Sequence, residues 1–183
     1  MTDTERYVPA AGRATFTRLY DPVMALSMRE GSWRRRFTER LAQDLPDGGV
    51  AADIGAGTGT FAIELANSRR DVTVIAVDGD PQSIDLARGK PGSDRVRWTE
   101  GLAAKLPSPD ASVDVVSMSL LLHHLSSASK RQALTEARRI LRTGGHLHIA
   151  DWGRPDLVTF AGFQFLRLLD GVENTREHAQ GSI

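Results

Sequence analysis

Between residues 50 and 150 the chain alternates short apolar runs with stretches of helical period, and few folds accommodate that alternation. The run Val72–Val77 (VTVIAV) is almost continuously β-branched, as expected for a strand buried on both faces. Strands that alternate with helices form βαβ units, which build a parallel sheet with right-handed crossovers. We therefore predict an α/β fold with a doubly wound, mainly parallel sheet. The expected strands are Val50–Ile54, Val72–Val77, Val96–Trp98, Val113–Ser119 and His146–Ala150.

The remaining stretches predict helices. Apolar residues at every fourth position form a stripe typical of a helix face, at Trp33, Phe37, Leu41 and Leu45. Shorter helical patterns lie at Phe16–Val23 and, largely apolar, at 157–169. The helices expected between the strands are Thr60–Ser68, Pro81–Arg88 and Ser129–Leu141, the last stopped by Gly144-Gly145. The 183 residues fit one domain, with an N-terminal helical cap (1–46), a core (47–155) and a C-terminal helix and tail (156–183).

Composition excludes several classes of function. The chain contains no cysteine, which excludes disulfide scaffolds, cysteine zinc sites and thiol nucleophiles. Its 23 basic and 23 acidic residues balance, so no global charge attracts nucleic acid, and we expect no nucleic-acid partner. No apolar run is long enough to span a membrane, and no spacing of His, Asp and Glu resembles a metal site. We expect a cytoplasmic protein without a resident metal.

A glycine-rich segment follows the first expected strand, at Asp53–Gly59 (DIGAGTG). Glycines let the backbone approach a ligand closely, and the following helix would offer unpaired N–H groups. The spacing Gly-x-Gly-x-Gly brings the third glycine one residue earlier than in dinucleotide-binding loops, which disfavours a nicotinamide oxidoreductase. Asp78 closes the second strand, where an acid can accept hydrogen bonds from both ribose hydroxyls of a nucleoside cofactor.

Four segments in order resemble the motifs of class I S-adenosylmethionine (SAM)-dependent methyltransferases, in particular the small-molecule branch that includes ubiquinone and menaquinone methyltransferases. These segments are residues 50–66 (VAADIGAGTGTFAIELA), 74–88 (VIAVDGDPQSIDLAR), 106–125 and 136–155. The resemblance implies a Rossmann-like fold, SAM as cofactor and S-adenosylhomocysteine as product. It also implies methyl transfer by in-line displacement to a small-molecule acceptor that is aromatic, quinone-like or lipid-related.

The resemblance assigns cofactor contacts by position. Asp53 would hold the amino group of SAM, Asp78 would bind the ribose hydroxyls, and Tyr20 would lie in a helix that caps the cofactor. The glycine loop would lie against the methionine part, and the backbone after the fourth strand would face the sulfonium. The residues so expected at the cofactor site are Tyr20, Asp53, Gly55, Ala56, Gly57, Gly59, Asp78, Gly79, Leu102, Ala103, Ser119 and Leu120.

Two departures from the family pattern concern adenine. Gly101-Leu102-Ala103 stands where the family usually has Gly-Asp-Ala, so the acid that accepts from the adenine amino group is missing. Asp80 or a backbone carbonyl could take its place, and the sequence leaves this open. Gly79 stands where a bulky apolar residue often packs on adenine.

Histidines supply the candidate catalytic groups. A base is needed only if the acceptor must lose a proton, and His123 and His124 follow the fourth strand, at the edge where this fold builds its site. The alternative is that they cap the next segment or lie at the surface. For His146 and His148, which alternate on the fifth strand, we expect a structural role.

The end of the chain suggests an oligomer. Complete family members carry an antiparallel hairpin after the fifth strand, and no such pattern is recognisable here. The fifth strand would then lie at an exposed edge, which promotes aggregation, so we expect a homodimer that covers this edge and the 157–169 helix. Alternative functions are a non-catalytic partner or regulatory subunit with the SAM fold, and a truncated, inactive methyltransferase.

Overall fold

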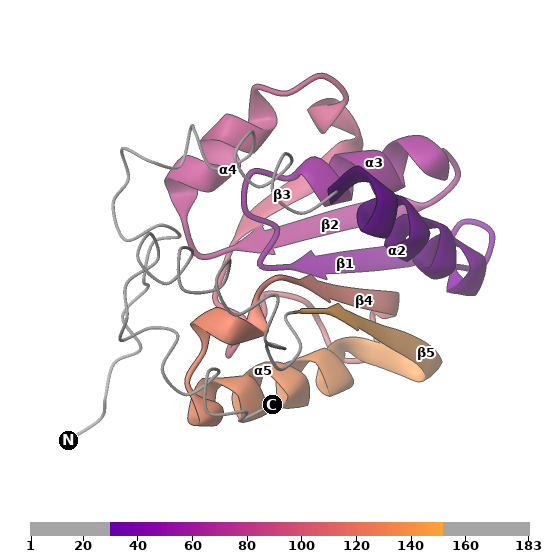
Figure 1. Cartoon of the computed structure of the whole chain (residues 1–183). Coiled ribbons are helices and arrows are strands. Elements are labelled where there is room, and N and C mark those ends of the chain that lie inside the picture. Colours follow the sequence, from indigo (N-terminus) through magenta and orange to yellow (C-terminus); the bar gives the residue numbers. More distant parts are fainter. Residues whose placement is uncertain (1–29, 152–183) are drawn as a thin grey trace, which may run out of the picture.

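The computed structural model describes residues 30–151, which form one α/β unit (Figure 1). The predicted helices at Phe16–Val23 and 157–169, as well as Tyr20, lie outside the described residues, and the division at residues 46 and 155 stays a prediction. The helices are α2 (Glu30–Asp44), α3 (Thr60–Ser68), α4 (Pro81–Arg88) and α5 (Ser127–Ile140), with short 3₁₀ turns η3 (Ser93–Arg95) and η4 (Leu122–His124). The strands are β1 (Val50–Ile54), β2 (Thr73–Asp78), β3 (Val96–Glu100), β4 (Val113–Ser119) and β5 (Leu141–Ala150).

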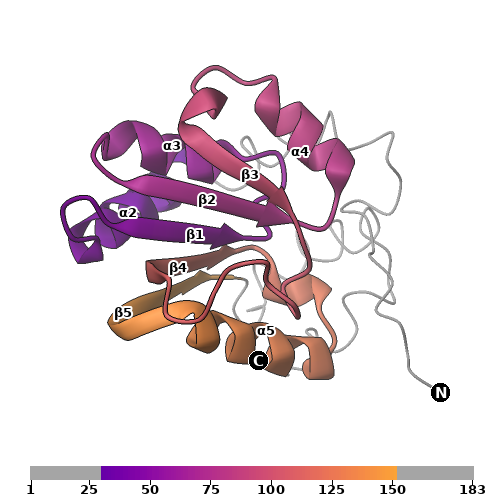
Figure 2. The ribbon, with the colours of Figure 1, turned by 180° about the vertical axis from the view of Figure 1, so that it is seen from behind.

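The five strands form one parallel sheet in the order β3-β2-β1-β4-β5, which confirms the predicted fold class. The chain builds outward from β1 to β2 and β3, and then returns to the other side of β1 with β4 and β5 (Figure 2). Ligands of such sheets bind where the strand order reverses, at the carboxyl ends of the strands. Here that point lies between β1 and β4.

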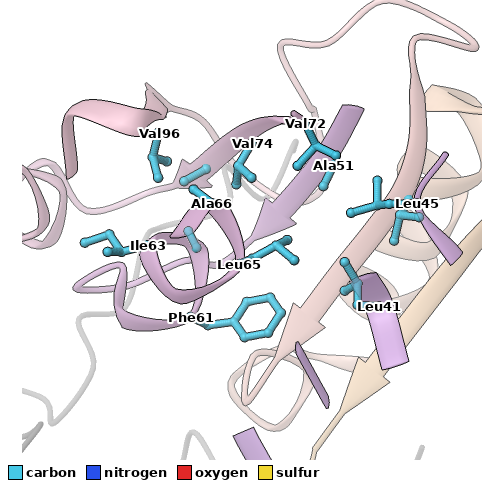
Figure 3. Packing of buried hydrophobic residues seen from close by; sticks show 13 residues of the cluster. Leu41, Leu45, Ala51, Phe61, Ile63, Leu65, Ala66, Val72, Val74 and Val96 are labelled. Atoms are coloured by element: carbon cyan, nitrogen blue, oxygen red, sulfur yellow. The ribbon is translucent and has the colours of Figure 1, made fainter. Parts of the chain in front are cut away.

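Alternating residues of the strands form two cores. On one face, the aliphatic residues of β1 and β2 pack with α3, with Leu41 of α2 and with Leu45 just after that helix, and Phe61 extends this cluster (Figure 3). On the other face, Ile54, Val77 and Met118 pack against α5. The predicted apolar stripe is therefore confirmed at Leu41 and Leu45, which are fully or almost fully buried.

The predicted stop of α5 at Gly144-Gly145 is wrong. The helix ends at Ile140, Leu141 already has extended backbone, and both glycines lie within β5. The pairing of β5 with β4 is irregular between Val113 and Val115, and a Cβ at Gly145 would come within 2.7 Å of the carbonyl oxygen of Asp114. The glycine is needed for this close approach of two strands, which a sequence pattern cannot distinguish from a helix stop.

Among residues 30–151, none of the helices has the length and apolar character needed to cross a bilayer. Within the same range, no group of three or more His, Asp or Glu side chains is placed to hold a metal ion.

Candidate cofactor and active site

The glycine loop between β1 and α3 is held in left-handed backbone. Gly55, Gly57 and Gly59 have φ angles of 72°, 54° and 75°, which residues with a Cβ rarely adopt. A Cβ at Gly55 would come within 2.7 Å of Leu121, and one at Gly59 would collide with the ring of Trp98. A Cβ at Gly57, by contrast, would meet no atom of residues 30–151 within 4 Å. In this part of the chain Gly57 therefore borders open space, while the other two glycines make room for side chains.

Asp78 ends β2 and ties this loop to the strand. Its Oδ2 accepts the N–H of Gly57 at 2.6 Å, and its Oδ1 accepts the N–H of Asp80 at 2.8 Å. The N–H groups of Gly55 and Ala56 are held by the carbonyl of Val77. Burial raises the pKa of Asp78, and the backbone hydrogen bonds oppose that rise. Each carboxylate oxygen can accept a further hydrogen bond, as a pair of ribose hydroxyls would require.

Asp53, the second-last residue of β1, has an incompletely paired carboxylate. Its exposed fraction is 1%, and its Oδ1 accepts a hydrogen bond of 2.8 Å from Oγ of Ser117. Its Oδ2 has no hydrogen-bond partner within the described residues. The pKa of Asp53 is raised to about 7, chiefly by burial. The hydrogen bond from Ser117 opposes this rise, and the charge of Asp78 adds to it. A buried polar atom without a partner at the edge of the sheet is the feature expected where a ligand completes the site.

The adenine side of the site departs from the family pattern in the structure as well. Asp80 caps α4, with Oδ1 accepting from the N–H of Gln82 at 3.0 Å and Oδ2 accepting from the hydroxyl of Ser83 at 2.8 Å. Its carboxylate therefore serves the helix, which weakens the case for Asp80 as the adenine acceptor. Leu102 is exposed and forms a short bridge with Lys105, and Ala103 packs against the core.

The end of β4 reaches the glycine loop. Ser119 is the last residue of the strand, and Leu120 has a φ of 53°, in the left-handed region that a leucine rarely adopts. The N–H of Leu120 bonds to the carbonyl of Ala150 on β5 at 2.8 Å, and Leu121 lies against Gly55. Strained backbone of this kind is concentrated at functional sites.

His123 forms a close pair with Asp151, a residue that the sequence did not indicate as functional. Nδ1 of His123 lies 2.8 Å from Oδ1 of Asp151, and the two side chains are 4% and 9% exposed. Oδ2 of Asp151 accepts the N–H of Leu122 at 2.6 Å. The ring of His124 lies against that of His123, with 3.9 Å between centroids and an angle of 42° between the ring planes. A signal was available, because Asp151 directly follows β5 and the carboxyl ends of β4 and β5 meet at one edge.

His146 and His148 lie on β5 and have different neighbours. Nε2 of His148 lies 3.1 Å from Oδ2 of Asp44 on α2, and burial lowers the pKa of His148. His146 is exposed, with its ring 6.4 Å from that of His148. These contacts fit the predicted structural role for His148.

Lys90 is a second residue that sequence reasoning missed. Its Nζ lies 2.9 Å from the hydroxyls of both Thr58 and Thr60, on either side of Gly59. It thereby anchors the end of the glycine loop to the segment after α4. No periodicity or motif links a lysine at position 90 with threonines 30 residues earlier.

Comparison with known proteins agrees with this geometry. Residues 51–145 match the family described as methyltransferase domain. The chain is 35% identical over 139 residues to the demethylmenaquinone methyltransferase of Deinococcus radiodurans, covering 75% of this chain and 56% of that protein. It is 32% identical to the 27-O-demethylrifamycin SV methyltransferase of Amycolatopsis mediterranei, covering 77% and 57%. The chain thus spans little more than half the length of these curated relatives.

Solved structures give the same result. A protein of Anabaena variabilis assigned to the methyltransferases of an antibiotic biosynthesis pathway superposes with a TM-score of 0.60 at 31% identity, covering 75% of this chain and 54% of that one. A SAM-dependent methyltransferase from Aquifex aeolicus superposes with a TM-score of 0.62 over 86% of this chain and 87% of that one. Its identity of 21% supports the fold alone.

Proposed function

Because the chain belongs to the methyltransferase domain family, we propose that it transfers a methyl group from SAM to a small-molecule acceptor. The observation that carries the proposal is the buried Oδ2 of Asp53, which has no hydrogen-bond partner among residues 30–151, near the start of a glycine loop in which the same residues leave space over Gly57. The carboxylate of Asp78 lies on the next strand. These groups fit a ligand with an ammonium group at one end and neighbouring hydroxyls at the other, as SAM has.

The binding residues would act mainly by positioning. Bound SAM supplies a methyl group on a sulfonium, which is an already activated leaving group. Asp53 would hold the ammonium end, Asp78 would hold the ribose, and the strained backbone at Leu120 would line the reacting side. Fixing both reactants in line can supply several kcal/mol of the barrier reduction, roughly 7–11 kcal/mol in the best-oriented cases.

His123 would act as a base for an acceptor that must lose a proton. An ionised carboxylate only accepts hydrogen bonds, so the 2.8 Å contact with Asp151 would favour the imidazole tautomer that carries its proton on Nδ1. Nε2 is then the basic nitrogen, and it would take the proton of an acceptor hydroxyl. Asp151 orients the ring and stabilises the imidazolium that forms. The ring of His124, which lies against that of His123, would restrict it further.

The acceptor we propose is an aromatic, quinone-like or lipid-related small molecule. The support is similarity to relatives that are named as methyltransferases of demethylmenaquinone and of a rifamycin. We further propose a cytoplasmic location, in keeping with a chain that lacks cysteine, and no nucleic-acid partner, in keeping with its zero net charge.

We also propose a homodimer. In the described part of the sheet β5 is the edge strand, and Leu147 and Ile149 on it are 37% and 43% exposed. An exposed apolar edge strand is commonly covered by another chain or segment. Light scattering on the full chain would test the dimer, and a monomer would contradict it.

Two assays test the methyltransferase. Isothermal titration with S-adenosylhomocysteine should give saturable binding, and labelled SAM should transfer its methyl group to at least one member of a panel of quinols and polyketide phenols. A protein that binds neither SAM nor S-adenosylhomocysteine contradicts the proposal.

A non-catalytic protein with the same fold is the second candidate. The observation that favours it is the lack of a carboxylate for adenine, since Leu102 is apolar and Asp80 caps α4. Binding of S-adenosylhomocysteine without turnover across the acceptor panel would support this candidate over the enzyme.

A further inference from the structure

Asp53 and Ser117 lie directly opposite each other on β1 and β4, where the strand order of the sheet reverses. Both residues are 1% exposed. Oγ of Ser117 is 2.8 Å from Oδ1 of Asp53 and 3.5 Å from the carbonyl oxygen of Ala52, so the short contact is the one to the carboxylate. The serine hydroxyl donates to one oxygen of Asp53, and the other oxygen is buried without a hydrogen-bond partner among the described residues.

Burial opposes the ionised form of Asp53. A buried carboxylate is costly unless hydrogen bonds or an opposite charge compensate it. The hydrogen bond from Ser117 is the side-chain contact that lowers the pKa of Asp53, against the larger effect of burial. The protonated and ionised forms are therefore close in free energy near neutral pH, and Ser117 shifts the balance toward the ion.

The charged surroundings of Asp53 act in the same direction as burial. On β2 the residue paired with Asp53 is Ala76, which carries no charge, and Asp78 at the end of that strand is negative. On β4 the neighbour is the neutral Ser117. Among the described residues, the charge that shifts the pKa of Asp53 is the negative charge of Asp78, and no positive charge offsets it. A cationic ligand would supply the missing positive charge.

We propose that Ser117 is a positioning residue that presents Oδ2 of Asp53 as an anionic acceptor, and that a ligand ammonium binds there with release of the proton of Asp53 to solvent. The inference rests on the proposed function, because the ammonium is that of the methionine part of the cofactor. Ligand affinity then depends on pH through Asp53, and Ser117 sets the pH at which the site becomes competent.

Ser117→Ala gives the sharpest test. Without the hydroxyl, the free protein keeps the proton of Asp53 to higher pH. A hydrogen bond to a charged group typically changes such an equilibrium by about tenfold or more. We expect Ser117→Ala to weaken binding of S-adenosylhomocysteine by about tenfold near pH 6.5 and by less than about threefold near pH 8.5. The ligand's own ammonium titrates identically for both proteins and cancels in the ratio of their affinities.

A matched control is available in the same chain. Ser83→Ala removes a hydroxyl that donates at 2.8 Å to the buried carboxylate of Asp80, which is not the proposed ammonium site. This variant should show the wild-type dependence of affinity on pH. Asp53→Asn should bind weakly at every pH, because it has no acid to ionise.

The measurement is isothermal titration of full-length proteins with S-adenosylhomocysteine in two buffers of different ionisation enthalpy. The wild type should release close to one proton near pH 6 and almost none near pH 8.5. This proton count needs no variant and remains informative if Ser117→Ala fails to fold. Binding without proton release, or a Ser117→Ala ratio that is the same at both pH values, overturns this inference alone. A wild type that binds no S-adenosylhomocysteine at any pH overturns the proposed function and this inference together.

Discussion

Oδ2 of Asp78 accepts the backbone N–H of Gly57 at 2.6 Å, so the acid at the end of β2 holds the loop that follows β1. The same carboxylate accepts the N–H of Asp80 through its other oxygen. Asp78 therefore shapes the glycine loop before any ligand arrives, and the ribose contact that we propose would be added to an existing structural role.

Asp78→Asn should weaken binding of S-adenosylhomocysteine by at least about tenfold. An amide has one accepting oxygen, so it cannot accept both backbone N–H groups, and the loop loses a fixed point. The control is Asp114→Asn, since Oδ2 of Asp114 accepts the N–H of Val50 at 2.8 Å at the opposite end of β1. Calorimetry should give wild-type affinity for that control. Equal losses in the two variants would mean that the effect is one of general stability.

Alanine at Gly55 and at Gly57 should have different effects. Gly57→Ala adds a Cβ in open space, so it should cost only the strain of a positive φ, about 1–2 kcal/mol of unfolding free energy, yet abolish ligand binding. Gly55→Ala adds the clash with Leu121 and should destabilise the fold more strongly. Urea denaturation and calorimetry on both variants test this. Unchanged affinity in Gly57→Ala would contradict the placement of the ligand over this loop.

Leu120 should reverse the usual preference for alanine over glycine. Leu120→Gly and Leu120→Ala both lose the apolar contacts that the leucine side chain makes beyond Cβ, but only glycine adopts a φ of 53° without strain. The glycine variant should be more stable than the alanine variant by about 1 kcal/mol in chemical denaturation. At the neighbouring strand position Ser119 the order should be the opposite, with alanine the more stable. The same order at both positions would argue against strain at Leu120.

His123→Gln should lower kcat by about 10²–10⁴-fold with an acceptor that loses a proton, while affinity for S-adenosylhomocysteine changes little. Asp151→Asn should also lower kcat, because it no longer fixes the proton on Nδ1. His146→Gln changes an exposed histidine away from this edge and serves as the control. Steady-state kinetics and calorimetry separate the two effects. An unchanged kcat in His123→Gln would show that His123 is not the base.

The stability of the unliganded protein should depend on pH through Asp53. Its pKa is raised from 3.8 to about 7 by burial, so the folded state holds a proton that the unfolded state has already released. The contribution is fully present below pH 3.8 and is lost as pH rises toward 7, by at most about 4 kcal/mol. Asp53→Asn removes this loss. In thermal denaturation, the Tm of Asp53→Asn relative to that of the wild type should therefore rise between about pH 4 and pH 8. A difference in Tm that stays constant over this range would contradict the raised pKa.

The sequence predicted those parts of the molecule that local pattern determines. Short, largely apolar runs identified β1, β2 and β4 to within a residue, and the glycine spacing with Asp78 predicted the edge at which the cofactor would bind. The wrong stop of α5 has a different origin, because Gly145 is required by the carbonyl of Asp114 on another strand.

The missed site residues share this non-local origin. Lys90 became recognisable as the anchor of Thr58 and Thr60 only when segments far apart in the chain were brought together. The position of Asp151 directly after β5 indicated the right edge of the sheet, but not its pairing with His123. A chain of ordinary aspartates and lysines gives no local sign of such pairs. Tertiary contact, rather than propensity or motif, determines which of them have a role.

The neighbouring positions of β1 and β4 divide the sheet into two halves with separate tasks. β1 and β2 carry the groups proposed for the cofactor, whereas β4 and β5 end in the proposed base and its partner. The two halves meet at the Asp53–Ser117 pair. The residues that serve the acceptor can therefore vary without a change in the acids proposed for the cofactor, provided that Ser117 of β4 stays paired with Asp53. A lineage of such proteins can diversify in the molecules it modifies while keeping a single methyl donor.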